Sequence, residues 1–181
     1  GTSQWMKAPN GQPTKLNEMQ WLQVRTPNFK AWFGDWEGDA KNASKVVDEN
    51  GEPMVVYHGS RKKGITEFYT FTLGIFGAGT YFTIHKHEAL SYSGEGRNLY
   101  PAFISMKNPM KIPANAFDKS YFKPASQEQT KSLGYNGVVT GDGKNLDIEY
   151  VIAFDPTQIK SATGNTGEFN PTNPDIRFSR T

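Results

Sequence analysis

The sequence contains no cysteine, which excludes disulfide bonds, thiolate metal ligands and a cysteine nucleophile. It also has little net charge, since 20 Lys and Arg residues nearly balance 18 Asp and Glu residues for a total of +2. A chain this close to neutral has no strong field to attract nucleic acid or a membrane surface. No apolar run approaches the roughly 20 residues that a membrane-spanning helix needs.

Aromatic residues make up a large part of the apolar content. The chain has four Trp, eight Tyr and twelve Phe among 181 residues, and 36% of all residues are hydrophobic. This content is enough to bury a substantial core. The length predicts one domain, or one domain with an extension.

The first 53 residues show helical rather than strand patterns. Residues 1–13 are polar and turn-rich, so we expect a flexible lead, and its opening letters GTSQWM could include residues foreign to the natural chain. An N-terminal helical extension is predicted over 14–53, with helices over 14–24 and 26–36 that pack on the body of the protein. The second helix places four aromatic residues on one face: Phe29, Trp32, Phe33 and Trp36.

From residue 54 the pattern changes to short strands with few helices. Strands are predicted over 54–58, 79–84, 100–106, 136–140, 149–155 and 158–162, and helices over 86–93 and 126–133. Because strands dominate without strict alternation, the pattern predicts an α+β fold. We expect a core domain over 54–162, followed over 163–181 by a Gly-, Asn- and Pro-rich surface tail or linker.

Three short stretches contain residue types suited to binding or catalysis. "VVYHGSR" ends an apolar strand in His58 and Gly59, where a bare backbone lets another molecule approach closely. "GAGTYFTIHKHEALSY" has a strand bearing Tyr81 and a helix that ends near Tyr92, and "DIEYVIAFD" opens an apolar strand with Glu149. Each stretch taken alone also fits a structural role, as a strand-end histidine, core tyrosines or a solvated glutamate.

Taken together and in order, "YHGSR", "GAGTYFT" with Tyr92, and "EYVIAFD" resemble the diphtheria-toxin-type, or His-Tyr-Glu, ADP-ribosyltransferases. This class includes the poly(ADP-ribose) polymerases, whose pattern the eleven-residue spacing of Tyr81 and Tyr92 also resembles. The resemblance covers 54–162, and the flanking stretches look like those of phage and prophage polyvalent proteins. It implies a split, mainly antiparallel sheet with NAD in the cleft between two half-sheets.

The resemblance implies that the "HGSR" stretch holds NAD, the co-substrate, without a metal. His58 would bind the adenine-side ribose with help from Ser60. The backbone of Gly59 would hold the nicotinamide carboxamide, because the missing Cβ allows a close approach. Arg61 would meet the pyrophosphate.

The other matched residues would act at the nicotinamide end. Tyr81 and Tyr92 would line the nicotinamide ring by aromatic stacking. Glu149 would bind the adjacent ribose and stabilise the positive charge that develops there as nicotinamide leaves. By resemblance to the class, the catalytic residues are His58, Tyr81 and Glu149.

Two positions depart from the pattern or extend it. Polymerases have a Ser eight residues after the motif Tyr to bind the carboxamide, and this chain has Ala89 there. Asp147 has the position that orients the acceptor in arginine-modifying relatives of another class, although an ordinary turn residue is an equal alternative. His85 and His87 do not share a helical face, so we expect no metal site.

The resemblance implies an NAD-dependent ADP-ribosyltransferase that modifies a macromolecule once per site and releases nicotinamide. We expect a phage or bacterial effector that acts as a monomer in the bacterial host cytoplasm, away from membranes. Near-neutral charge favours a protein acceptor over nucleic acid. Two alternatives are an NAD glycohydrolase toxin and a non-catalytic binding module of a larger phage protein, although a binding module would not need Glu149.

Overall fold

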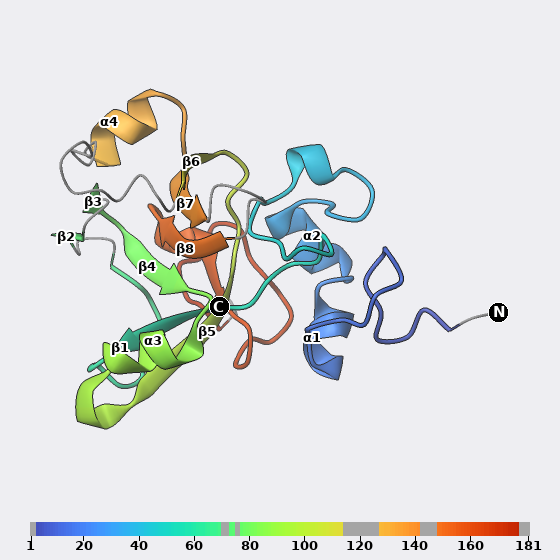
Figure 1. Cartoon of the computed structure of the whole chain (residues 1–181), viewed down its shortest axis with the longest axis horizontal. Coiled ribbons are helices and arrows are strands. Elements are labelled where there is room, and N and C mark those ends of the chain that lie inside the picture. Colours follow the sequence, from blue (N-terminus) through green and yellow to red (C-terminus); the bar gives the residue numbers. More distant parts are fainter. Residues whose placement is uncertain (1–2, 70–72, 75–76, 114–126, 142–147, 178–181) are drawn as a thin grey trace.

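The computed structural model of the chain describes residues 3–69, 73–74, 77–113, 127–141 and 148–177 (Figure 1). These residues form a seven-stranded sheet in the order β6-β7-β8-β4-β1-β5-β9 and a two-stranded sheet of β2 and β3. Neighbouring strands are antiparallel except β6 and β7, which are parallel. With few and short helices, this is the α+β fold that the sequence predicts.

The strands are β1 Val56–Ser60, β2 Leu73–Gly74, β3 Gly77–Ala78, β4 Thr80–Thr83, β5 Asn98–Ile104, β6 Pro109–Pro113, β7 Gly137–Gly141, β8 Ile148–Ala153 and β9 Ile159–Ser161. The helices are α1 Glu18–Gln23, α2 Pro27–Phe33, α3 Lys86–Ser91 and α4 Gln127–Ser132, with 3₁₀ turns η1 Ala40–Asn42, η2 Gly94–Gly96 and η4 Pro156–Gln158. The sequence pattern missed β6, because prolines at both ends hide a strand. Proline is tolerated there since β6 is at the edge of the sheet.

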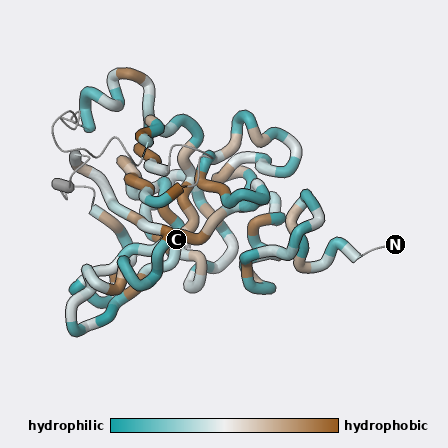
Figure 2. Tube along the Cα trace, viewed as in Figure 1, coloured by the Kyte–Doolittle hydropathy of each residue, from teal (hydrophilic) through white to brown (hydrophobic). Residues whose placement is uncertain are grey.

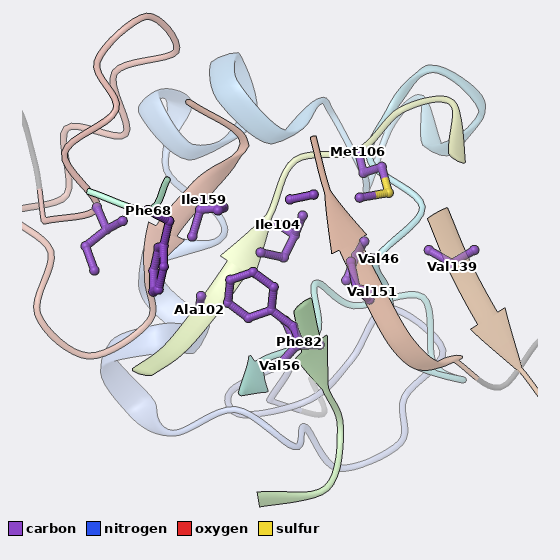
Figure 3. Packing of buried hydrophobic residues seen from close by; sticks show 12 residues of the cluster. Val46, Val56, Phe68, Phe82, Ala102, Ile104, Met106, Val139, Val151 and Ile159 are labelled. Carbon is purple, nitrogen blue, oxygen red and sulfur yellow. The ribbon is translucent and has the colours of Figure 1, made fainter. Parts of the chain in front are cut away.

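The main apolar core lies against one face of the sheet. Buried side chains from β1, β4, β5, β7, β8 and β9 meet there with the loop residue Phe68 (Figure 3). A smaller cluster on β7 and β8 includes Val138 and Ile152, with Tyr81 packed against it. Figure 2 shows the hydrophobic stretches along these central strands and hydrophilic stretches over the outer loops.

The N-terminal helices pack on the body through an aromatic cluster, as expected. Thr26 caps α2 through its side chain, Pro27 begins the helix, and the buried rings of Phe29 and Phe33 stack 4.9 Å apart. Phe29 also meets Phe103 of β5 edge to face. This burial is what a structural role predicts for the extension.

The C-terminal segment differs from the predicted surface tail. Phe169 and Ile176 are both buried in core clusters. Lys160 of β9 is 1% exposed and donates to the carbonyl oxygens of Asn173 at 2.6 Å and Asp175 at 3.2 Å. The composition did not predict this burial, because the segment is mostly polar. Only two apolar side chains and a set of backbone contacts attach it to the body of the protein.

Candidate active site

The sheet divides between β1 and β4. Strand β1 pairs with β5 from Val56 opposite Ala102 to Ser60 opposite Asn98, whereas it pairs with β4 only at Tyr57 opposite Thr83. Past Tyr57 the two strands diverge (Figure 1). One half-sheet is β9-β5-β1 and the other is β4-β8-β7-β6. Among the described strands, none pairs with the edge of residues 58–60 that faces β4.

His58 spans this division with its side chain. Its Nδ1 atom lies 2.7 Å from the carbonyl oxygen of Tyr81 on β4. Because a carbonyl only accepts, Nδ1 carries the proton, and Nε2 of the neutral ring is left as an acceptor. Burial beside Phe68 and Phe82 lowers the pKa of His58, against the opposing effect of the Tyr81 bond. His58 is therefore neutral at neutral pH.

Gly59 is in close contact with α3. A Cβ built on Gly59 would lie 1.6 Å from the carbonyl oxygen of Ala89 and 3.4 Å from the nitrogen of Ser93. Close packing against α3 therefore also requires a glycine at position 59. The sequence interpretation gave only the approach of a ligand as the reason. Ala89, the position where the polymerase pattern has Ser, lies directly against Gly59.

The two tyrosines have different surroundings. Tyr81 is half-buried in β4 opposite Ile152, and its hydroxyl donates to the carbonyl of Gly77 at 2.5 Å. Tyr92 forms the C-cap of α3 and is 66% exposed. An exposed aromatic ring at this position is available for stacking.

Glu149 lies at an irregular point of β8. The pairing of β7 with β8 shifts from Thr140 opposite Tyr150 to Gly141 opposite Ile148, so Glu149 is the extra residue, as in a β-bulge. Its carbonyl accepts from Ile84 at 3.1 Å. Among the described residues its carboxylate has no hydrogen-bond or ion-pair partner. Bulges re-aim side chains and are frequent beside active sites.

A second carboxylate near the site was missed by the sequence interpretation. Glu88 of α3 accepts a hydrogen bond from the Tyr150 hydroxyl at one oxygen and from Thr83 Oγ1 at the other, 3.1 Å away. The bond to Glu88 raises the pKa of Tyr150, with further contributions from burial and from the nearby carboxylates of Glu88 and Glu149. The pattern "KHEALS" gave no signal beyond an ordinary helix.

The remaining predicted residues are less closely connected to these groups. Ser60 Oγ accepts from the Lys62 backbone at 3.1 Å, and Arg61 is exposed beside Gly94. No described contact joins either of them to Tyr81 or Glu149. Asp147 lies outside the described residues.

A cavity of about 880 Å³ lies between the N-terminal extension and the sheet, and none of the predicted site residues that the structure describes lines it. Its lining includes Ile84 and Ile148, which adjoin Glu149 along the sheet and the chain. Among the described residues, no cluster of three or more His, Asp or Glu side chains has the arrangement of a metal site. No described helix is long and apolar enough to cross a membrane.

The divided sheet and the ordered motifs define the chain as an ADP-ribosyltransferase domain. The family model of the ADP-ribosyltransferase in polyvalent proteins matches residues 48–169, more than half of the chain. The chain belongs to this family, whose domains use NAD as co-substrate. No curated protein shows significant similarity to the chain.

Proposed function

We propose that the chain transfers a single ADP-ribose unit from NAD to a macromolecular acceptor and releases nicotinamide, as an effector of a phage or bacterium in the bacterial host cytoplasm. A protein acceptor fits the net charge of +2 better than nucleic acid does. Family membership supports the ADP-ribosyl transfer in general. The acceptor class and the roles of individual residues belong to this proposal.

The observation that carries the proposal is the division between β1 and β4, with His58 on one side and Tyr81 and Glu149 on the other. The groups present suit the parts of NAD. Nε2 of neutral His58 accepts from a ribose hydroxyl, and the unpaired edge of β1 at Gly59 offers backbone groups to a carboxamide. The exposed ring of Tyr92 suits the nicotinamide ring.

Glu149 is the proposed catalytic carboxylate. Nicotinamide is already a good leaving group, so the reaction requires negative charge near the developing cation more than a strong general acid. The carboxylate of Glu149 has no hydrogen-bond or ion-pair partner among the described residues, so it is available for that purpose. Asp147, proposed to orient the acceptor, precedes Glu149 by two residues.

The alternative is an NAD glycohydrolase, in which water is the acceptor. The exposure of Tyr92 does not distinguish the transferase from the glycohydrolase, so the reaction product must identify the activity. We expect NAD labelled in its adenylate part to label a macromolecule when the protein is incubated with bacterial lysate. Free ADP-ribose alone would indicate the hydrolase, and intact NAD would indicate a binding module. Glu149→Gln is the control that separates enzymatic labelling from chemical glycation by ADP-ribose.

A further inference from the structure

Glu88 lies where three elements of the candidate site meet. Its two carboxylate oxygens accept hydrogen bonds from the Tyr150 hydroxyl of β8 and from Thr83 Oγ1 of β4, the latter at 3.1 Å. Glu88 itself belongs to α3. One side chain therefore joins α3 to two neighbouring strands of the half-sheet that carries Glu149.

The same helix also contacts the other half-sheet. The carbonyl of Ala89, the next residue, presses on Gly59 of β1 so closely that a Cβ there would lie 1.6 Å away. Helix α3 thus bridges the division of the sheet, and it ends at the exposed Tyr92. A displacement of α3 would move Tyr92 relative to both half-sheets.

Tyr150 directly follows Glu149 at the register shift of β8. The bond to Glu88 and the neighbouring negative charges raise the pKa of Tyr150, so its hydroxyl stays protonated and donates across the physiological range. The contact therefore anchors the residue beside the proposed catalytic carboxylate.

We propose that Glu88 and Tyr150 are positioning residues for ADP-ribosyl transfer, and that their contact fixes Tyr92 relative to Glu149. This inference rests on the proposed function. Both carboxylate oxygens of Glu88 are engaged by hydroxyl groups of the chain itself, so Glu88 acts through Tyr150 and α3 and does not react.

The test is a double-mutant cycle with Glu88→Ala and Tyr150→Phe, read as nicotinamide release. Loss of a hydrogen bond to a charged group predicts a fall of about tenfold in kcat/KM for each variant. Tyr150→Phe removes one of the two hydrogen bonds that Glu88→Ala removes, so the double variant falls by about as much as Glu88→Ala alone and not by about a hundredfold. Benzamide, a non-reacting analogue of the nicotinamide end, loses affinity in all three variants because Tyr92 shifts.

Conservative variants separate positioning from reaction and from unfolding. Glu88→Gln keeps an acceptor for the Tyr150 hydroxyl, so it retains most activity, unlike Glu149→Gln. Thr83→Val removes the other hydrogen bond of Glu88 and leaves the Tyr150 contact in place, so it shifts kcat/KM in the same direction by less. Tyr135→Phe makes the same chemical change as Tyr150→Phe outside the site, and it leaves turnover and benzamide binding unchanged.

Multiplicative losses in the double variant, unchanged benzamide affinity in folded Glu88→Ala, or a Glu88→Gln variant as inactive as Glu149→Gln would each overturn the inference. A wild-type protein that releases no nicotinamide would overturn the proposed function instead. Thermal unfolding of each variant establishes the folded fraction to which turnover is normalised. If Tyr150→Phe fails to fold, the activities of Glu88→Gln and Thr83→Val still test the inference.

Discussion

Nδ1 of His58 lies 2.7 Å from the carbonyl oxygen of Tyr81, and this contact joins the two half-sheets past the point where their strands stop pairing. It fixes the tautomer of the imidazole and turns Nε2 into an acceptor. The contact therefore links the fold of the divided sheet to the proposed binding of a ribose hydroxyl.

NAD affinity is expected to depend on pH through His58. Burial holds the pKa of His58 below its ordinary value of 6.5, so affinity is constant above that pH and falls as the pH decreases through the lowered pKa. Protonation replaces the acceptor at Nε2 with a donor. Calorimetry at a series of pH values from 7.5 downward measures this fall.

The same protonation removes folding stability. Because the fold favours the neutral imidazole, the contribution of His58 is fully present above pH 6.5 and is lost as the pH falls through the folded-state pKa. His58→Ala lowers NAD affinity about fivefold, the loss of roughly one hydrogen bond, and abolishes the pH dependence. His87→Ala, at an exposed position of α3, is the control, and a pH dependence that persists without His58 would contradict the assignment.

The α+β class could be predicted because the strands of the core have strong, short apolar patterns. The division of the sheet could not be derived from those patterns, because it depends on where the pairing of β1 with β4 stops. The burial of Phe169 and Ile176 was also invisible, since each is an isolated apolar residue in a polar segment.

The C-terminal segment is expected to contribute to stability. Ile176 is 4% exposed and packs in the main core, and its carbonyl accepts from Ser161 at 2.7 Å. Ile176→Ala should lower the free energy of unfolding by about 2–5 kcal/mol, measured by chemical denaturation. Thr172→Ala, at an exposed position of the same segment, serves as the control. A change below about 0.5 kcal/mol for Ile176→Ala would restore the interpretation of a surface tail.

Gly59→Ala is expected to displace α3. The added Cβ would meet a backbone oxygen at 1.6 Å, which a rotamer change cannot relieve. Overpacking of this kind lowers the free energy of unfolding by about 3 kcal/mol or more, so the protein should unfold at a lower temperature. Benzamide binding should also be lost. Gly164→Ala, whose Cβ would lie 3.5 Å from Ser161 Oγ, should be tolerated. A stable Gly59→Ala variant that still binds benzamide would show that the close contact is not required.

Glu149→Gln is expected to reduce turnover far more than binding. The carboxylate acts on charge that develops during the reaction, so kcat should fall by about 100-fold or more while KM for NAD changes little. Stopped assays of nicotinamide release measure both constants. Transfer at the wild-type rate would exclude Glu149 as the catalytic carboxylate.

The candidate site residues could be proposed from the sequence, but the contacts among them could not. His58, Tyr81 and Glu149 stand out because their residue types and order match a motif. Glu88 did not stand out, because its partner Tyr150 is 62 residues away in sequence and only the pairing of β4 with β8 brings them together. The motif also gave no sign that Gly59 packs against the carbonyl of Ala89, where a Cβ would lie 1.6 Å away.

Tyr92→Ala tests whether the exposed ring binds nicotinamide. A side chain that is 66% exposed contributes little to the core, so thermal stability should be nearly unchanged. Stacking contributes about 0.5–1.5 kcal/mol beyond area burial, so affinity for benzamide should fall severalfold. Leu133→Ala, which removes a side chain that is 68% exposed at the end of α4, controls for loss of surface apolar area. Wild-type affinity in a folded Tyr92→Ala variant would remove Tyr92 from the nicotinamide site and leave Tyr81 as the ring partner.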